Sequence, residues 1–210
     1  MRANARRRLC ARVRYALARK GAATPVVVTT ERLVLRTWAP EDRSDLIGLL
    51  GEPEIVRWLN VGVPFATEEI DAFLDRQTET ARLRGWCRWA LQLREPSQDD
   101  PAGVVGFCGF GCAFAPDVEL GWTLAPAMWG RGLATEAAEA ALDYGFRTIG
   151  FTEIISAVLP DNVRSRRIAE KIGEVVRGTV THDGLRHLRY AAENPGPLPL
   201  PEPGIRRDCL

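Results

Sequence analysis

The stretch from Val118 to Phe146 constrains the fold more than any other part of the sequence, because it predicts a strand, a glycine turn and a helix in succession. Residues 118–124 read Val-Glu-Leu-Gly-Trp-Thr-Leu, which is typical of a strand. After the turn, small residues recur with the period of a helix that begins at about Ala134 and ends at about Phe146. They are Ala134, Ala137, Ala138, Ala141, Leu142 and Gly145. Such a face is suited to close packing, so helices layered on a sheet are expected.

The turn itself, Trp129-Gly130-Arg131-Gly132-Leu133-Ala134, predicts a phosphate site. Because Gly130 and Gly132 lack Cβ atoms, the backbone can aim successive amides at one point and let an anion approach closely. The helix start adds unpaired amides and a partial positive charge. A P-loop would require Gly-Lys-Ser/Thr where Leu133-Ala134-Thr135 stands, and the dinucleotide fingerprint would require glycine at residue 135. An ordinary glycine-rich connection is the alternative.

The rest of the chain alternates strands and helices without an internal repeat. Strand patterns cover residues 31–38, 86–93, 104–114 and 154–159, and a last hairpin between Val175 and Tyr190 turns at Asp183-Gly184. Helix patterns cover residues 41–50, 53–59, 68–83 with Thr67 as the cap, and a basic helix that Asp161 or Asn162 caps and Gly173 ends. The fold class is therefore α+β or α/β, a mixed sheet with helices packed on it.

Length and composition fit one globular domain between two terminal extensions. The 210 residues, 46% hydrophobic and 26% charged, are typical of a single domain. We assign residues 25–193 to this domain and residues 194–210 to a Pro-rich tail that cannot pair into a sheet. Residues 1–24 are a leader whose first 20 residues hold eight basic side chains and no acidic one. A disordered extension or a start codon assigned too early explains this leader, and an amphipathic targeting helix is the alternative.

Charge and hydropathy disfavour several partners. Lys plus Arg number 28 against 27 for Asp plus Glu, so the whole molecule has no field that would steer it onto nucleic acid, and the basic leader is the one segment that could bind it. No run approaches the ~20 apolar residues of a membrane span, and Arg12 and Arg14 interrupt the run from Leu9 to Leu17 that a secretory signal would need. We therefore expect a cytoplasmic monomer or homodimer without a membrane partner.

The five cysteines are odd in number and scattered, which is no disulfide framework. Cys108 and Cys112 have the spacing C-x3-C, but they lie in an apolar run rich in Gly and Phe without a second pair of ligands. Buried strand thiols are expected rather than zinc, and no metal site is predicted.

Beyond these patterns, residues from about Thr30 to Ala192 resemble the GNAT acetyltransferases, and within them the RimJ/RimL-like branch that acetylates protein N-termini and small amines. The segments that carry the resemblance are residues 30–36 (TERLVLR), 105–110 (VGFCGF), 118–122 (VELGW), 129–137 (WGRGLATEA), 162–165 (NVRS) and 170–173 (EKIG). The resemblance implies a seven-stranded mixed sheet, splayed between its fourth and fifth strands, with acetyl-CoA in the cleft.

The resemblance also implies which residues hold this co-substrate. The pyrophosphate would lie on the backbone of residues 129–135, Leu124 would pair with the pantetheine arm through its backbone, and Asn162 and Ser165 would lie on the opposite wall. The implied set is Leu124, Trp129, Gly130, Arg131, Gly132, Leu133, Ala134, Thr135, Asn162 and Ser165. The side chains that would meet the CoA phosphates, unless they are simply solvated, are Arg131, Arg164, Arg166, Arg167 and Lys171.

Two side chains are predicted to carry out direct transfer from a thioester to an amine. An amine attacks only when neutral, and a pKa of about 8 to 10.4 means that a base must assist. Glu119 is the candidate base, acting through water, with a structural carboxylate as the alternative. Ser165 is the candidate proton donor to the leaving thiolate, because the position of the family's tyrosine is Ala169; a cofactor contact without proton transfer is the alternative. A strand amide near Leu124 would hold the developing oxyanion.

Several positions depart from the family pattern or have no assigned role. The first loop residue is Ala127 where the family often has Gln or Arg, and Glu174 stands where it has an aromatic residue. Neither change removes a backbone amide, so both bear on rate and acceptor more than on cofactor binding. His182 and His187 flank the last turn and are interpreted as surface residues. The tryptophans are interpreted as core, unless one of them lines the acceptor pocket.

Three functions are consistent with the sequence. The one we predict is an acetyl-CoA-dependent N-acetyltransferase that acts on a protein N-terminal amine or a small-molecule amine in a ternary complex. The second is a non-catalytic acyl-CoA-binding regulatory module, suggested by Ala169 and Glu174. The third is an RNA- or ribosome-associated protein tethered by the basic leader. The acceptor would be chosen by residues 52–66 and the final hairpin.

Overall fold

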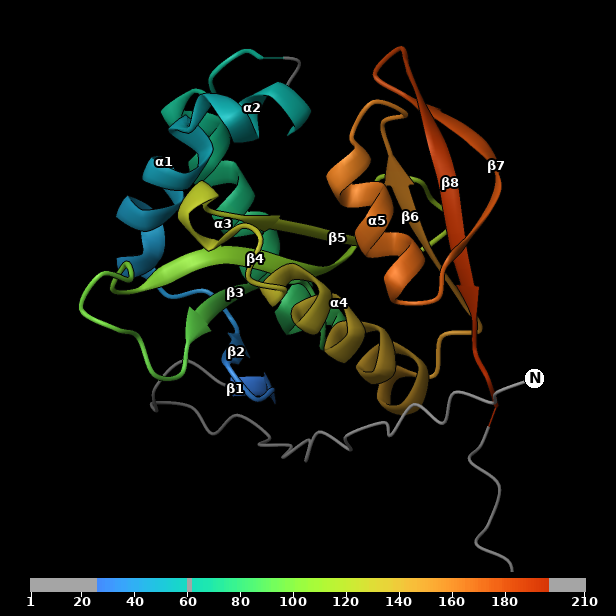
Figure 1. Cartoon of the computed structure of the whole chain (residues 1–210), viewed down its shortest axis with the longest axis horizontal. Coiled ribbons are helices and arrows are strands. Elements are labelled where there is room, and N and C mark those ends of the chain that lie inside the picture. The colour runs from blue at the N-terminus through green and yellow to red at the C-terminus, as the bar shows by residue number, and fades with distance from the viewer. Residues whose placement is uncertain (1–25, 60–61, 197–210) are drawn as a thin grey trace, which may run out of the picture.

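The computed structural model describes residues 26–59 and 62–196, which form one mixed sheet with helices on both faces (Figure 1). The strands are β1 (Val26–Thr29), β2 (Leu33–Arg36), β3 (Arg88–Leu93), β4 (Val104–Gly111), β5 (Glu119–Leu124), β6 (Glu153–Val158), β7 (Val175–His182) and β8 (Leu185–Glu193). The α-helices are α1 (Arg43–Gly51), α2 (Pro53–Leu59), α3 (Thr67–Arg84), α4 (Leu133–Tyr144) and α5 (Val163–Lys171). The strand order is β1-β2-β3-β4-β5-β6-β8-β7, with β5 and β6 parallel and the other neighbours antiparallel.

The described sheet has eight strands, one more than the sequence predicts. The additional strand is β1, which pairs with β2 at the edge of the sheet. Its four residues are too few to show the alternation on which the prediction of a strand depends. The seven predicted strands are β2 to β8, so the predicted splay between the fourth and fifth falls between β5 and β6.

Helix α4 packs closely on the sheet through small residues, as the sequence predicts. Ala137, Ala138 and Ala141 are fully buried in the larger core. At the end of α4, where one π-helical turn (Gly145–Ile149) follows, a Cβ on Gly145 would lie 2.6 Å from the ring of Phe110. The glycine turn that precedes α4 is therefore held against the middle of the sheet.

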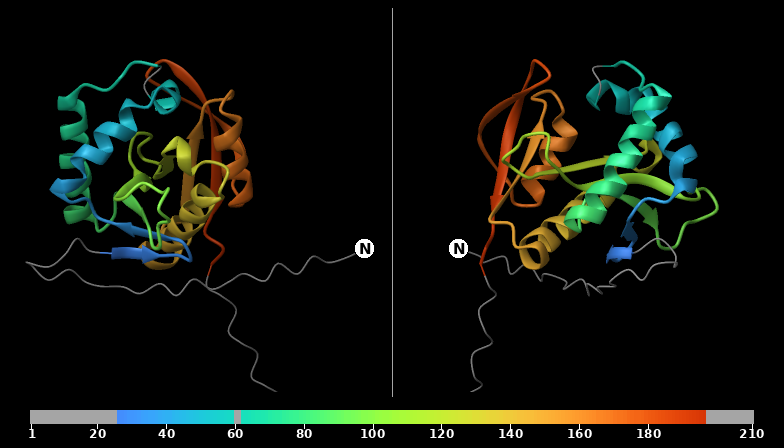
Figure 2. Two further views of the ribbon diagram at one scale, coloured as in Figure 1. Left: turned by 60° about the vertical axis from the view of Figure 1, so that its left-hand side comes forward. Right: turned by 180° about the vertical axis from the view of Figure 1, so that it is seen from behind.

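The opposite face of the sheet is covered by α1 and α3 (Figure 2). These helices pack on a second core around Trp38, Phe73 and Phe107, whose ring centroids lie 5.3 to 6.4 Å apart. Ile55 of the short helix α2 joins the same core, which fixes α2 beside the sheet. The two cores occupy opposite sides of β3 and β4, as expected for strands whose side chains alternate between faces.

Two predicted helix starts are wrong. Thr67 does not cap α3, because the cap residue is Ala66, whose amide N–H donates to the Glu69 carboxylate at 2.7 Å. A carboxylate three residues into a helix can satisfy the cap amide without a hydroxyl at the start. The helix predicted over residues 41–50 is divided into a 3₁₀ turn (Pro40–Asp42) and α1.

The C-terminal hairpin follows the prediction. β7 and β8 turn at Asp183-Gly184, with φ angles of 48° and 76° that suit a two-residue hairpin turn. Asn194, assigned to the tail by the sequence, belongs to the fold, because its side-chain amide donates to the carbonyls of Phe146 and Phe151 at 3.2 and 2.9 Å. The basic leader and residues 197–210 lie outside the described residues.

The C-x3-C pair is divided between core and surface. Cys108 is buried, whereas Cys112 is exposed, since β4 ends at Gly111 and not at the predicted Phe114. The expectation of a buried thiol is therefore wrong for Cys112. In the described part of the chain, no group of three or more His, Cys, Asp or Glu side chains is arranged to hold a metal ion. No helix among the described residues is long and apolar enough to cross a membrane.

Candidate functional site

A cleft opens where β5 and β6 part. The two strands share one residue pair, Glu119 with Ile155, whereas β4 and β5 share six. Beyond that pair the two strands diverge (Figure 1). A cavity of about 680 Å³ lies where they part. One wall is formed by β5, the loop after it and α4, and the other by β6 and α5. We call the point where the strands part the apex of the cleft.

The cavity reaches both faces of the sheet. Residues 119, 121 and 123 of β5 share the face covered by α1 and α3, because Thr123 pairs with Phe107 of the second core. Residues 120, 122 and 124 alternate to the face covered by α4. All six line the cavity, which Ile55 and Trp58 of α2 close on the first face. A ligand could therefore enter from either side and meet a second ligand in the gap.

The backbone of β5 turns polar groups toward this gap. Since the amide of Ala125 donates to the carbonyl of Val105 at 2.9 Å, the alternation of an antiparallel pair directs the N–H and C=O groups of residues 120, 122 and 124 away from β4. The carbonyl of Leu124 is engaged, because the indole N–H of Trp129 donates to it at 2.7 Å. Of the two backbone groups predicted to meet the pantetheine arm, the Leu124 amide is the one that points into the cleft.

The glycine turn has the backbone that the sequence predicts for an anion site. Gly130 and Gly132 have φ angles of 74° and 78°, in the left-handed region that favours glycine, and Gly132 is the cap residue from which α4 starts. The turn residues that line the cavity are Trp129, Gly130, Gly132, Leu133, Ala134 and Thr135. The unpaired amides of the first turn of α4 therefore lie at the cavity wall.

Arg131 does not place its side chain in the cavity, contrary to the expectation that it meets the CoA phosphates. Its guanidinium forms an ion pair with Asp100 of the loop between β3 and β4. The hydrogen bonds from Arg131 and Ser97 hold the pKa of the half-buried Asp100 below its usual range. Arg131 therefore fixes the outside of the turn, while Gly130 and Gly132 on either side of it line the cavity.

The turn is also braced from the N-terminal strands, by a contact that the sequence analysis missed. The carboxylate of Glu136 accepts hydrogen bonds from the hydroxyl of Thr30 at 2.5 Å, the amide of Arg32 at 2.8 Å and the guanidinium of Arg32 at 2.7 Å. The same guanidinium donates to the carbonyl of Arg131 at 2.8 Å. Burial raises and these bonds lower the pKa of Glu136, with a net shift downward. Arg32 and Glu136 both lie in segments that carry the family resemblance. Their opposite charges were the one sequence feature that could have indicated the pair.

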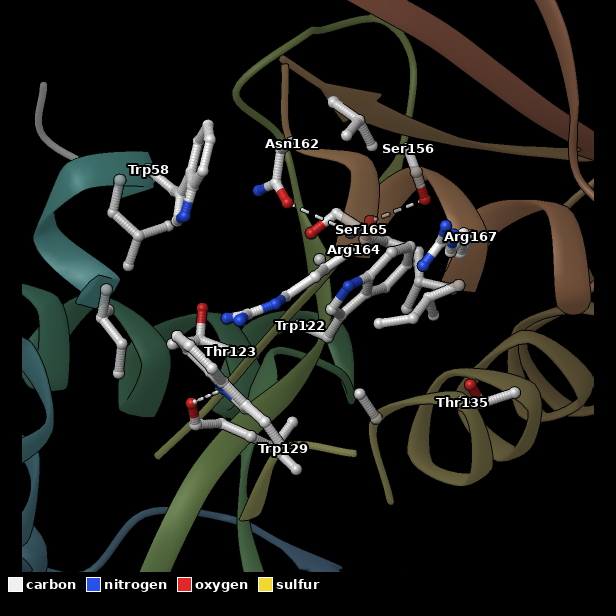
Figure 3. A pocket seen from close by; sticks show the side chains of 18 of the residues that line it. Trp58, Trp122, Thr123, Trp129, Thr135, Ser156, Asn162, Arg164, Ser165 and Arg167 are labelled. Carbon is white, nitrogen blue, oxygen red and sulfur yellow. Dashed lines mark hydrogen bonds between the residues drawn. The ribbon is translucent and has the colours of Figure 1, made fainter. Parts of the chain in front are cut away.

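The second wall is set by the start of α5 (Figure 3). The side chain of Asn162 caps the helix by accepting the amide N–H of Ser165 at 3.1 Å, as predicted. Arg164 reaches across the cleft to stack on Trp129, with its guanidinium carbon 4.4 Å from the ring centroid. The α5 residues that line the cavity are Arg164, Ser165, Arg167, Ile168 and Lys171. Arg166 instead donates to the hydroxyl of Tyr190 at 3.3 Å.

Glu119 lies at the apex end of the cavity, 8% exposed, with its carboxylate 2.6 Å from the guanidinium of Arg88. Arg88 comes from β3 and crosses β4 and β5 where glycine leaves room, since a Cβ on Gly111 or Gly121 would lie 3.1 or 3.4 Å from its guanidinium. Sequence reasoning missed Arg88, because the two residues are 31 positions apart and only the folded sheet places their strands on either side of β4. Ala169 is fully buried beside Val158 and brings no hydroxyl to the site.

Glu174 is a second buried carboxyl close to the apex. It is 2% exposed, and burial raises its pKa to about 8 while a hydrogen bond with Ser156 at 3.0 Å opposes the rise. Ser156 itself lines the cavity. The sequence marked Glu174 as a departure from an aromatic position but did not show that it would be paired with a serine in the cleft.

The aromatic residues near the cleft differ in part from their predicted roles. Trp86 and Trp89 are core residues, as predicted, whereas Trp58 and Trp122 line the cavity. His187, interpreted as a surface residue of the last hairpin, is half-buried on β8 and also lines the cavity.

Comparisons with known proteins agree with this geometry. Residues 32–175 match the family model described as acetyltransferase (GNAT) domain. The chain is 28% identical over 146 residues to the uncharacterized N-acetyltransferase p20 of Bacillus licheniformis, covering 68% of this chain and 79% of the relative.

Solved structures show the same arrangement of strands and helices. An acetyltransferase from Agrobacterium tumefaciens has a TM-score of 0.68 at 27% identity, covering 86% of this chain and 99% of that one. The aminoglycoside acetyltransferase AAC(6')-Ib in complex with coenzyme A has a TM-score of 0.62 at 19% identity, covering 77% and 94%. The latter likeness concerns the fold alone.

Proposed function

The chain belongs to the GNAT acetyltransferase family and is therefore an acyltransferase, and on this premise we propose that it transfers an acetyl group from acetyl-CoA directly to a primary amine in a ternary complex. The observation that carries the proposal is a cleft between β5 and β6 whose wall is formed by the left-handed glycine turn and the start of α4. The two faces of this cleft suit two substrates that meet in the gap between the strands.

The residues of the first wall fit a pyrophosphate. Gly130 and the residues from Gly132 to Thr135 line the cavity at the N-terminus of α4, where anions are favoured. Across the cleft, Arg164, Arg167 and Lys171 supply positive charge for further phosphate groups. Acetyl-CoA brings the acetyl group to this site as a reactive thioester. The Leu124 amide, directed into the cleft, is our candidate for holding the oxyanion that develops on the carbonyl.

Glu119 remains our candidate base, acting through a water molecule. It lies on the face closed by α2, where an acceptor amine would enter, and its carboxylate is held by Arg88 at 2.6 Å. This ion pair fixes the direction of one carboxylate oxygen and leaves the other oxygen to take a proton. That oxygen would accept a proton from the acceptor amine through the water molecule, which leaves the amine neutral for attack.

Ser165 is the candidate proton donor for the thiolate that leaves. It lines the cavity at the start of α5, beside Asn162, which fixes the helix turn. Its hydroxyl would donate a proton in place of the tyrosine whose position is Ala169. Asn162 serves the site by positioning Ser165, so a change at either residue would act on the same wall.

The acceptor would enter on the face of the cleft that α2 closes. We favour the RimJ/RimL-like assignment, with a protein N-terminal amine or a small-molecule amine as the acceptor in the cytoplasm. The pocket on the acceptor face combines the apolar side chains of Trp58, Ile55 and Phe107 with the charged side chains of Glu54, Arg88 and Glu119. A regulatory module that binds acyl-CoA without turnover is the second candidate, favoured by the engagement of Glu119 with Arg88.

The test is release of CoA thiol from acetyl-CoA with a panel of N-terminal peptides and small amines. Glu119→Gln should lower kcat roughly 10²- to 10⁴-fold, because general base catalysis contributes about that much. Ser165→Ala should lower it less if water can donate instead. The matched control is Glu79→Gln, which removes an exposed carboxylate of α3 paired with Arg82. Binding of CoA without turnover for any acceptor would favour the regulatory module.

A further inference from the structure

Glu174 is a buried carboxyl that the proposed mechanism does not use. It follows the glycine that ends α5, and its amide donates to the carbonyl of Ala169 at 3.0 Å, which fixes it beneath the helix. Its Oε1 meets Ser156, whereas its Oε2 is buried without a hydrogen-bond partner among the described residues. A lone ionised carboxylate is costly in such a place, so the neutral acid is favoured.

Ser156 connects this carboxyl to the apex of the cleft. Its Oγ lies 3.0 Å from Oε1 of Glu174 and 2.9 Å from the carbonyl oxygen of Leu120 on β5. Figure 3 shows Ser156 on the wall of the cavity. Ser156 directly follows Ile155, which makes the single β5–β6 pair in the described sheet. The next link between the two strands is therefore made by a side-chain hydroxyl, at the position where the backbone ladder stops.

The two hydrogen bonds of Ser156 depend on the proton of Glu174. A hydroxyl has one proton to donate. When Glu174 is neutral, its O–H donates to Ser156 Oγ, and the Ser156 proton remains for the Leu120 carbonyl. When Glu174 is ionised it can only accept, so it takes the Ser156 proton and the Leu120 carbonyl loses its donor. Both bonds exist together only with the protonated acid.

The ionisable groups on the surrounding elements do not account for the state of Glu174. Its pKa is raised to about 8 by burial, opposed by the Ser156 hydrogen bond. On neighbouring elements, Glu119 pairs with Arg88, Arg189 with Glu153, and Glu170 with Tyr190, while Arg167 and Lys171 line the cavity. Burial and the opposing hydrogen bond together place the pKa of Glu174 at about 8, so its protonation changes near neutral pH.

We propose that Glu174, acting through Ser156, is a positioning residue whose proton ties β6 to β5 at the apex and so sets the separation of the two cleft walls. Loss of that proton releases the Leu120 carbonyl, widens the cleft and weakens the binding of CoA between the walls. The effect on CoA binding rests on the proposed function, because it requires that CoA binds in this cleft. It assigns a role to the residue that replaces an aromatic side chain.

The first experiment needs no cofactor. A carboxyl whose pKa is raised from 4.5 to about 8 by folding stabilises the protein fully below pH 4.5 and loses that contribution as the pH rises to about 8. The equilibrium constant for unfolding of the wild type should therefore rise about tenfold per pH unit over this range relative to Glu174→Gln, which means that the wild type becomes less stable. Urea unfolding at a series of pH values measures it. Glu170→Gln, which removes an exposed carboxylate four residues away, should keep the wild-type slope.

The second experiment measures the cleft itself. The dissociation constant of CoA is determined by calorimetry at pH 7 and pH 9 for the wild type, Glu174→Gln and Ser156→Ala. The glutamine amide donates to Ser156 at every pH, so this variant should bind CoA about tenfold more tightly than the wild type at pH 9 and equally at pH 7. Ser156→Ala, which leaves Leu120 without its donor, should bind weakly at both.

The outcomes separate the two proposals. If Glu174→Gln keeps the wild-type dependence of stability on pH, or removes it without changing the pH dependence of CoA binding, the positioning role is wrong. If the wild type binds no CoA at any pH, the proposed function fails instead. Amide hydrogen exchange of β5 and β6, compared between wild type and Glu174→Gln at each pH, then decides the role of Glu174. Faster exchange in the wild type at pH 9 supports the positioning role, and equal exchange overturns it.

Discussion

The two walls of the cleft are held in place very differently. The β5–α4 wall is bound from several directions, by Glu136 with Arg32, by Arg131 with Asp100, and by Trp129 with the Leu124 carbonyl. The β6–α5 wall meets it at one backbone pair, at the Ser156 hydroxyl and through the stacking of Arg164 on Trp129. The first wall is thus fixed around the glycine turn by several polar contacts, whereas the second joins it through fewer polar contacts and the packing of Ile154 and Ile168 on the larger core.

This difference follows from what each wall has to hold. A pyrophosphate is bound by amides whose directions must be fixed before the ligand arrives, since an ordered site loses less freedom on binding. The second wall must let a long flexible cofactor enter between the strands and must then close on it. Changes in the first wall should therefore disturb binding strongly, and changes in the second wall should disturb it weakly or in a pH-dependent way.

The largest effect is expected from Gly132→Val in the first wall. Gly132 has a φ angle of 78°, and a branched residue in this region is strained by about 1–2 kcal/mol or more, so CoA affinity should fall roughly 30-fold. Calorimetry with CoA measures this. Gly150→Val is the control, because Gly150 has a φ angle of 86° with open space around it but lies outside the cavity lining. It should lose stability and keep its CoA affinity.

A smaller effect is expected from Glu136→Gln, which weakens the brace between the N-terminal strands and the turn. The loss of charge-assisted bonds to Arg32 should raise KM for acetyl-CoA about three- to tenfold with little change in kcat. Asp143→Asn, on the same helix, removes an exposed carboxylate paired with Arg147 and should leave KM unchanged. Equal KM values for the two variants would show that the first wall does not depend on this brace.

The smallest effect is expected from Arg164→Gln in the second wall. Loss of a stacked Arg–Trp contact of about 0.5–1 kcal/mol corresponds to a two- to fivefold change in the dissociation constant of CoA, while Arg167 and Lys171 keep positive charge on this wall for the phosphates. Arg84→Gln, which removes a similar stack on Trp86 away from the cavity, should change nothing. A loss as large as that of Gly132→Val would contradict the distinction between the walls.

The parts that could be predicted from the sequence are local. The glycine turn, the small face of α4 and the Asn162 cap each depend on residues within about one helical turn or two of each other, where spacing is enough to predict contact. The family resemblance added the splayed sheet, which local patterns do not contain. The prediction failed locally at Thr67, because the helix is capped one residue earlier, at Ala66, whose amide donates to the Glu69 carboxylate.

The parts that could not be predicted depend on partners far apart in the chain. Arg32 and Glu136 are 104 residues apart, Arg88 and Glu119 are 31 apart, and Ser156 and Glu174 are 18 apart. From the sequence alone, each of these polar side chains would be interpreted as an exposed surface residue. Their pairing follows from the register of the strands and from the approach of α4 and α5 to the sheet.

The sequence by itself therefore determined the family, the phosphate-binding turn and the strand–turn–helix around it, because these depend on backbone conformations that nearby residues impose. The tertiary structure alone decided which charged groups face the ligand, which are engaged with each other and which are buried. Burial and distance set the energy of a charge, and both are properties of the whole fold. For that reason Glu174, an isolated departure in the sequence, becomes the acid beside the apex of the cleft.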